Sequence, residues 1–237
     1  MSLVQTEPKS IKIGSTPIKR VTIRPNGTEK QIRPVWWQPW ANTIAYYPLK
    51  EDTNDHSWNN RNLINTWVTF TGWVWNFDGS SYANRSWTEQ LNTWYTISLI
   101  AKSSVNNTAF IFDMRNNNEY WQGVNLITEN WYFKVRQQKS SNTEEEYNRS
   151  RDWNENHWVI TWTGSVWTVY FNWTQVKQAT INNSINTSNT NLALWVRYSL
   201  NSWKYTWTIR EFIVEDKVWS AQEISDYYNQ TKWNYWL

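Results

Sequence analysis

The chain contains no cysteine, and this absence excludes several kinds of chemistry. Without cysteine there is no disulfide, no thiolate nucleophile and no metal site with sulfur ligands. No apolar run reaches the length of about 20 residues that a membrane-spanning helix needs, so we expect no membrane insertion. The first eleven residues are polar and lack the apolar stretch of a secretory signal peptide. The sequence therefore predicts a protein that is intracellular, or associated with a virion, before its release.

Neither sign of charge dominates the sequence. The 237 residues include 23 basic and 20 acidic side chains, which leaves a formal net charge of +3. Proteins that bind nucleic acid usually concentrate basic residues on one face, and attraction to an anionic membrane also needs basic clusters. We therefore expect neither nucleic acid nor membrane as a partner. The length suits one β-sandwich of ordinary size with a short appendage.

Glycine is scarce in this chain, and tryptophan is abundant. There are 6 glycines and 22 tryptophans, whereas an average glycine usage of about 7% would give about 17. Several tryptophans stand where a tight turn favours glycine, as in Asn130-Trp131 and Asn172-Trp173. Some bacterial lineages and their phages translate UGA as glycine, so we hypothesise that many of these residues are glycines printed as tryptophan. The alternative is a tryptophan-rich chain whose indole rings stack on sugars.

The hypothesis divides the tryptophans into groups. The positions that favour glycine are Trp58, Trp67, Trp94, Trp131, Trp153, Trp173, Trp195, Trp207, Trp233 and Trp236, of which Trp58, Trp153 and Trp207 are interpreted as loop or turn residues. Three residues suit a sandwich core or a family motif and are interpreted as genuine tryptophans: Trp158, Trp162 and Trp219. The sequence leaves both identities open for Trp36, Trp37, Trp73, Trp75, Trp87, Trp167 and Trp203.

Two segments of different character divide the chain. Residues 1–40 are punctuated by prolines and contain short apolar-polar alternations, which predicts an N-terminal appendage with short strands. Residues 41–237 contain many short alternating runs separated by Asn, Ser and Asp, a pattern typical of antiparallel sandwiches. Ser220 followed by Glu223 is a capping-box signal that predicts one helix over about residues 221–229. The fold class that we predict is all-β, a two-sheet antiparallel jelly-roll sandwich with one short C-terminal helix.

Five stretches are more informative together than each is alone. Residues 44–49 (IAYYPL) and 54–59 (NDHSWN) are followed by residues 76–82 (NFDGSSY), 157–164 (HWVITWTG) and 218–224 (VWSAQEI). In this order they resemble the first strand and loop, the next strand, a hairpin and the closing helix of laminin G-like domains in the concanavalin A-like lectin/glucanase superfamily. The resemblance implies two stacked sheets, one of them concave, and non-catalytic recognition of glycans, proteins or cell surfaces.

The appendage carries a second, shorter resemblance. Residues 11–21 (IKIGSTPIKRV) are similar to a short element of phage structural proteins. Together with the polar N-terminus, this similarity suggests a phage tail or prophage origin. In that setting residues 1–40 would contact other virion proteins.

The sequence offers no set of residues for catalysis. Glucanases of this fold carry their carboxylates as Glu-x-Asp-x-x-Glu on one strand, and no such segment occurs. Glu144, Glu145 and Glu146 are consecutive, so their side chains cannot all face one cleft, and we interpret them as a solvated loop. The two histidines, His56 and His157, are too few for a zinc site without cysteine, and His157 is interpreted as structural. We therefore predict that the protein is not an enzyme.

Two stretches are candidates for ligand binding. Residues 115–122 combine guanidinium, amide and aromatic groups that suit a sugar, although an ordinary polar hairpin loop has the same composition. The candidate glycan site comprises Arg115, Asn117, Asn118, Tyr120, Trp121 and Arg136. Asp52 and Asp55 are candidate calcium ligands, but residues of this type also stabilise turns by bonding to their own backbone. Arg210 stands where the laminin G-like family often has Asp, which makes calcium less expected.

These observations favour a non-catalytic module that binds a glycan or another cell-surface ligand, carried by a phage tail or prophage. The alternative is a structural virion or surface protein, in which the sandwich is a spacer or decoration and residues 1–40 mediate assembly. A glycoside hydrolase is the least favoured hypothesis.

Overall fold

The structure is a computed structural model. The chain consists of two compact units, Met1–Gln38 and Pro39–Leu237. The structure describes residues 21–23, 30–32, 41–49, 51–71, 75–78, 80–88, 91, 94–103, 109–115, 123–129, 131–139, 143–150, 152, 154–181, 190–194 and 206–235. In the first unit the described residues form one antiparallel pair, β1 (Val21–Ile23) with β2 (Lys30–Ile32). The predicted short strands around residues 11–14 lie outside the described residues.

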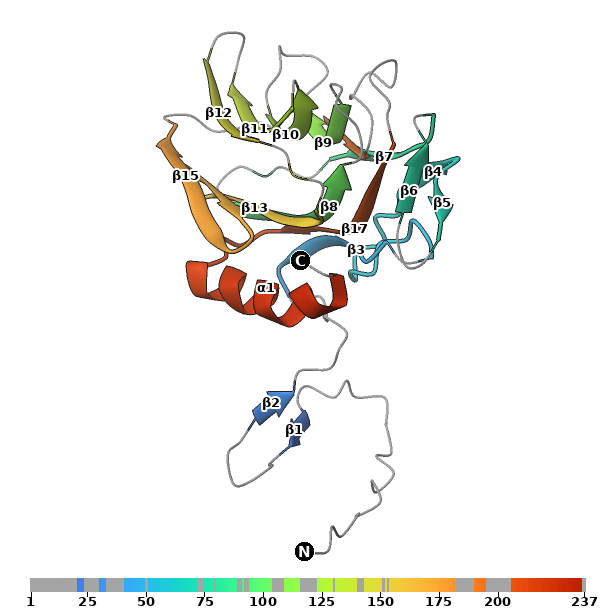
Figure 1. Cartoon of the computed structure of the whole chain (residues 1–237), viewed down its shortest axis with the longest axis horizontal. Helices are drawn as coiled ribbons and strands as arrows, with labels where there is room; N and C mark the ends of the chain where they lie inside the picture. The colour runs from blue at the N-terminus through green and yellow to red at the C-terminus, as the bar shows by residue number, and fades with distance from the viewer. Residues whose placement is uncertain are drawn as a thin grey trace, which may run out of the picture. The chain divides into compact units, whose positions relative to one another are not determined.

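The second unit is a sandwich of two antiparallel sheets (Figure 1), as predicted. The seven-stranded sheet has the order β12-β11-β10-β9-β16-β7-β4. Its strands are β4 (Ile64–Thr66), β7 (Tyr82–Trp87), β9 (Ala109–Arg115), β10 (Gly123–Glu129), β11 (Tyr132–Lys139), β12 (Thr143–Ser150) and β16 (Thr190–Leu194). This sheet carries the candidate site.

The eight-stranded sheet has the order β15-β14-β13-β8-β17-β6-β5, and β3 also pairs with β17. Its strands are β3 (Thr43–Tyr47), β5 (Thr69–Phe70), β6 (Trp75–Asp78), β8 (Tyr95–Ser103), β13 (Asn156–Trp162), β14 (Val166–Phe171), β15 (Thr174–Thr180) and β17 (Thr206–Glu215). Trp207 lies inside β17 opposite Phe77, so its interpretation as a loop residue was wrong.

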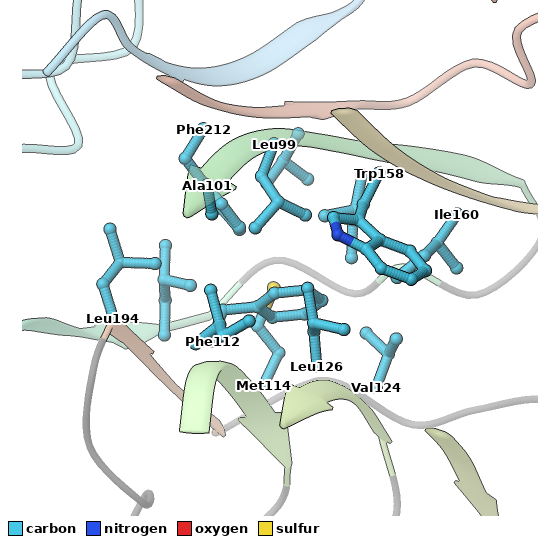
Figure 2. Packing of buried hydrophobic residues seen from close by; sticks show 14 of the residues in the cluster. Leu99, Ala101, Phe112, Met114, Val124, Leu126, Trp158, Ile160, Leu194 and Phe212 are labelled. Atoms are coloured by element: carbon cyan, nitrogen blue, oxygen red, sulfur yellow. The ribbon is translucent and has the colours of Figure 1, made fainter. Parts of the chain in front are cut away.

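The core fills the space between the sheets with apolar side chains from both. Leu99, Trp158, Ile160 and Phe212 of the eight-stranded sheet face a second apolar layer (Figure 2). The opposing layer comes from β9, β10 and β16 and includes Phe112, Met114, Val124, Leu126 and Leu194. Trp158 and Trp162 are fully buried, which agrees with their interpretation as core tryptophans.

Side chains of β12 contact β14 and β15 at one edge of the sandwich. Glu145 of β12 forms an ion pair of 3.4 Å with Lys177 of β15, and the Arg149 guanidinium lies 3.8 Å from the ring centroid of Phe171. Glu146 points to the opposite face of β12, where it bonds to Arg136. The expectation that residues 144–146 form a loop was therefore wrong, although adjacent carboxylates do face opposite ways, as predicted.

The helix α1 (Ala221–Tyr235) covers the outer face of the eight-stranded sheet (Figure 1). It begins at the predicted capping box: the Glu223 N–H donates to Ser220 Oγ at 3.2 Å, and the Ser220 N–H donates to Glu223 Oε2 at 2.9 Å. It continues beyond residue 229, where the Thr231 hydroxyl donates to the Tyr227 carbonyl at 2.8 Å. Within the described ranges, no helix has the length and apolar character needed to cross a membrane.

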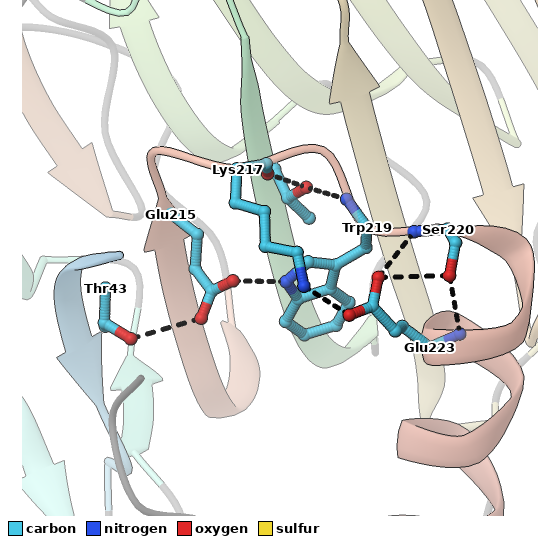
Figure 3. A network of polar contacts seen from close by, with 7 residues as sticks. Thr43, Glu215, Lys217, Trp219, Ser220 and Glu223 are labelled. Atoms are coloured by element: carbon cyan, nitrogen blue, oxygen red, sulfur yellow. Dashed lines mark hydrogen bonds and ion pairs between the residues drawn. The ribbon is translucent and has the colours of Figure 1, made fainter. Parts of the chain in front are cut away.

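A network of polar groups joins the start of the helix to the sheet (Figure 3). Glu215, at the end of β17, accepts hydrogen bonds from the Thr43 hydroxyl at 3.1 Å and from the Trp219 indole N–H. Lys217 forms an ion pair with Glu223 of the capping box. Burial is the largest effect on Glu215 and raises its pKa to about 7, against the smaller opposing effects of these hydrogen bonds. Trp219 is thus buried, which fits its interpretation as a genuine tryptophan.

Candidate functional site

A row of mostly polar positions crosses the outer face of the seven-stranded sheet. Phe112 and Met114 of β9 belong to the core, so the alternating residues Asp113 and Arg115 face outward. Residues that are directly paired in an antiparallel sheet share a face. The register therefore aligns Asn84, Ala193, Asp113, Asn125, Arg136 and Glu146 across six strands.

The centre of this row is a buried ion pair. The Arg115 Nε lies 2.6 Å from Asp113 Oδ1 and its Nη2 lies 2.7 Å from Asp113 Oδ2. The two side chains are 2% and 0% exposed, and the guanidinium carbon is 4.9 Å from the ring centroid of Phe110. A bidentate pair of this kind holds the guanidinium rigidly. Arg115 is therefore buried beside Asp113, and its predicted part in glycan binding stays a prediction.

Toward one end of the row the side chains become accessible to solvent. Lys134 Nζ lies 2.7 Å from Glu129 Oε2 and 3.6 Å from Glu146 Oε1. Arg136 Nη2 lies 3.1 Å from the same Glu129 oxygen, and its Nε also pairs with Glu146. Tyr132, two residues before Lys134 on β11, shares this face and is 44% exposed. We call these five residues the β11 cluster.

The β11 cluster fixes charged groups at a partly exposed surface. Its four charged side chains are 18–31% exposed. Burial raises the pKa of Glu146, but the hydrogen bond from Arg136 and the nearby charges of Arg136 and Lys134 outweigh it, so the net pKa lies below the ordinary value. The carboxylate is therefore ionised at neutral pH. The cluster presents two carboxylates, an ammonium and a guanidinium in one defined arrangement.

The other residues of the predicted glycan site lie outside the described part of the chain. These are Asn117, Asn118, Tyr120 and Trp121. Of the predicted set, the structure thus places Arg115 and Arg136 on one face of the same sheet, the first buried and the second accessible. Of the β11 cluster, sequence reasoning identified Arg136 and missed Glu129, Tyr132, Lys134 and Glu146. The available signal was the alternation in residues 132–136, where polar side chains interleave with Phe and Val.

Asp55, a predicted calcium ligand, organises the loop after β3. Its Oδ1 accepts hydrogen bonds from the backbone N–H groups of Tyr46 at 2.9 Å and Ser57 at 2.8 Å. Its Oδ2 accepts from the Ser57 hydroxyl at 2.7 Å and from the Arg61 N–H at 2.8 Å. The side chain is buried. This arrangement favours the turn-forming role that the sequence left open for Asp55.

Asp52, the second predicted calcium ligand, is more exposed and bonds locally. Its oxygens accept from the Asn54 N–H at 3.0 Å and the Asn54 amide at 2.7 Å, and His56 Nε2 lies 3.3 Å away. The described residues contain no group of three or more His, Asp or Glu side chains suited to a metal ion. Calcium binding by Asp52 and Asp55 stays a prediction.

The structure also brings a serine and a histidine together beneath α1. The Ser98 hydroxyl lies 2.8 Å from His157 Nε2, and the rings of Tyr227 and Tyr228 lie 5.5 and 6.2 Å from the imidazole. Both residues are fully buried, and burial lowers the pKa of His157 to about 3. A hydrolytic triad needs a third acidic group at the other ring nitrogen and access for substrate; in the described structure Nδ1 has no hydrogen-bond partner. The pair fits the predicted structural role of His157.

No family model and no curated protein matches the sequence. Among solved structures, the binding domain of botulinum neurotoxin serotype D is similar, with a TM-score of 0.65 and 13% identity over 79% of this chain and 51% of that chain. The binding domain of Paraclostridial Mosquitocidal Protein 1 has a TM-score of 0.66 and 15% identity, over 79% of this chain and 52% of that chain. The binding domain of botulinum neurotoxin DC in complex with SialylT has a TM-score of 0.62 and 14% identity, over 80% of this chain and 51% of that chain.

The chain spans about half the length of these neighbours. At such low identity the likeness concerns the fold. It shows a jelly-roll β-sandwich of the kind found in toxin domains whose names describe binding and not catalysis.

Proposed function

We propose that this chain is a non-catalytic module that binds a glycan, or a cell surface bearing one, through the β11 cluster. The observation that carries the proposal is the arrangement of Lys134 and Arg136 between two carboxylates, on the same face as the exposed ring of Tyr132. Fixed ionic groups bind sugar hydroxyls, and an aromatic ring packs on the apolar face of a sugar. The shared fold with toxin binding domains, one of them in complex with SialylT, supports this function.

The charge balance of the cluster favours an uncharged sugar. Two cations and two carboxylates form ion pairs with one another, so little net field extends to attract an acidic group. Carboxylates also repel a sugar acid directly. The proposed ligand class is therefore neutral hexoses, or N-acetylated amino sugars, that carry vicinal hydroxyls.

The test is a glycan array with the full chain, followed by titration of the strongest ligand against variants. Tyr132→Ala and Arg136→Ala should each weaken binding at least about tenfold, which corresponds to about 1.4 kcal/mol. Lys177→Ala is the matched control, because Lys177 forms a comparable surface ion pair on the other sheet. Binding that Tyr132→Ala and Arg136→Ala leave unchanged would refute the assigned surface, and binding confined to sialylated glycans would refute the ligand class.

Residues 117–121, which lie outside the described part of the chain, are a proposed extension of this surface. Asn117, Asn118, Tyr120 and Trp121 follow directly after Arg115, which the buried pair with Asp113 anchors on the same face. Calcium at Asp52 and Asp55 is a separate proposal, and its test is the same array with calcium and with a chelator. Loss of binding in chelator would support it, and identical binding in both would refute it.

A structural role in a virion is the second proposed function. It rests on the separate compact unit Met1–Gln38 and on the similarity of residues 11–21 to phage proteins. In this proposal the sandwich is a laminin G-like, concanavalin A-like domain of a phage tail, and residues 1–40 bind neighbouring virion proteins. A folded chain that binds no glycan, and that loses its oligomeric state when residues 1–38 are deleted, would favour this second function.

A further inference from the structure

Three tryptophans occupy a backbone conformation that suits glycine. The φ angles are 60° at Trp67, 72° at Trp131 and 65° at Trp173, all in the left-handed region. Trp67 lies between β4 and β5, Trp131 precedes β11, and Trp173 joins β14 to β15. The Cβ of an ordinary residue crowds the backbone in this region, and the penalty is greatest for bulky side chains.

The other non-glycine residues with positive φ have an evident reason for it. Asn60 and Asn172 are of a type that adopts this region readily. Leu49 is almost fully buried, so core packing compensates its strain. Asn172 with Trp173 is a two-residue hairpin loop with positive φ at both positions, which is the conformation that Asn-Gly favours.

The exposure of the tryptophans separates the same three from the core residues. Trp67, Trp131 and Trp173 are 74%, 58% and 47% exposed, whereas Trp158 and Trp162 are fully buried. Apolar burial therefore contributes little at these turns to offset the backbone strain. Trp173 makes one ring contact, with its centroid 4.2 Å from that of Tyr228. A large side chain at these sites combines strain with exposure.

We infer that positions 67, 131 and 173 are glycine in the natural protein, encoded by UGA in a code that assigns this codon to glycine. The tryptophans of the core, represented by Trp158 and Trp162, remain tryptophan and are encoded by UGG. The inference bears on recognition because the three exposed indoles then supply no surface for stacking on sugars. At position 131 it also leaves Tyr132 as the aromatic ring of the adjoining surface.

The codons of the gene, together with peptide mass spectrometry of the natural protein, test the inference directly. We expect UGA at positions 67, 131 and 173, UGG at positions 158 and 162, and peptide masses that contain glycine at the first three. UGG at the three turn positions would overturn it, as would masses that contain tryptophan there. UGA at positions 158 and 162 would overturn the proposed division between turn and core.

Thermal unfolding supplies an independent readout on the chain as printed. Trp67→Gly and Trp131→Gly should each raise Tm by about 2–4 °C, because glycine removes the left-handed strain. Trp94→Gly is the matched control: the sequence pattern placed Trp94 among the positions that favour glycine, but this residue is 55% exposed and its φ is not positive. Glycine at position 94 should therefore lower Tm or leave it unchanged. Equal effects in all three variants, or a fall in Tm for the first two, would contradict the backbone argument.

Discussion

Replacement of Asp55 by Ala separates a structural role of this carboxylate from a role in metal binding. The side chain is buried and takes four hydrogen bonds, three of them from the backbone N–H groups of Tyr46, Ser57 and Arg61. Without the carboxylate these donors lose their acceptor. Each unsatisfied buried donor costs about 1–3 kcal/mol, and hydrogen bonds to a charged group lie at the upper end of the usual range.

The expected loss in the free energy of unfolding for Asp55→Ala is about 3–4 kcal/mol, because water reaches part of this loop and the separate losses do not add fully. For a domain of this size such a loss lowers Tm by about 10 °C. Asp52→Ala is the control, since the Asp52 bonds are local and exposed, and it should change stability by less than about 1 kcal/mol.

The assay is urea unfolding of both variants and the parent chain, each in calcium and in chelator. The structural interpretation expects a large effect of Asp55→Ala that is the same in both buffers, and no effect of chelator on the parent. An Asp55→Ala loss below about 1 kcal/mol would refute the reasoning. A chelator effect on the parent that matches the Asp55→Ala loss would instead assign a metal to this loop.

Two further perturbations test other parts of the structure. Burial raises the pKa of Glu215 from 4.5 to about 7, so the folded state binds this proton more tightly than the unfolded state does. The stabilising contribution is therefore complete below about pH 4.5 and lost as the pH rises through about 7. Urea unfolding from pH 4.5 to 8 should show this loss in the parent and not in Glu215→Gln; parallel profiles would refute the assignment. Gly123 has a φ of 141°, and a Cβ there would lie 2.0 Å from the Met114 carbonyl oxygen. Gly123→Ala should thus lower the free energy of unfolding by about 2 kcal/mol or more. An unchanged Tm would refute this prediction, because it would mean that the backbones of β9 and β10 move apart at little cost.

Local signals in the sequence predicted local structure well. Ser220 and Glu223 predicted the start of α1 because the capping box needs only residues that are close along the chain. The hairpin at Asn172 was predicted for the same reason. Where an element depends on a distant partner, the prediction failed: Trp207 was placed in a loop, but its strand is completed by pairing with Phe77 and Ser103.

The candidate site shows the same limit more sharply. Arg136 was identified from its type, yet its partners come from two different neighbours, Glu129 of β10 and Glu146 of β12. The acidic run at residues 144–146 was interpreted as a solvated loop because three consecutive side chains cannot all face one cleft. In the strand that forms, Glu146 lies opposite the Arg136 cation of β11, whereas Glu145 and Glu144 lie opposite Gln137 and Gln138. Only the pairing of three strands makes these side chains one site.

Burial divides the two arginines of the predicted site in a way that composition cannot. Arg115 and Arg136 have the same chemistry, but Arg115 belongs to the central strand β9 and Arg136 to β11, one strand from the edge. A central guanidinium is covered and needs an adjacent carboxylate, which Asp113 provides two residues away on the same face. Near the edge the guanidinium of Arg136 keeps contact with solvent. The position of a strand in its sheet, and not the type of its residues, therefore separates the buried arginine from the accessible one.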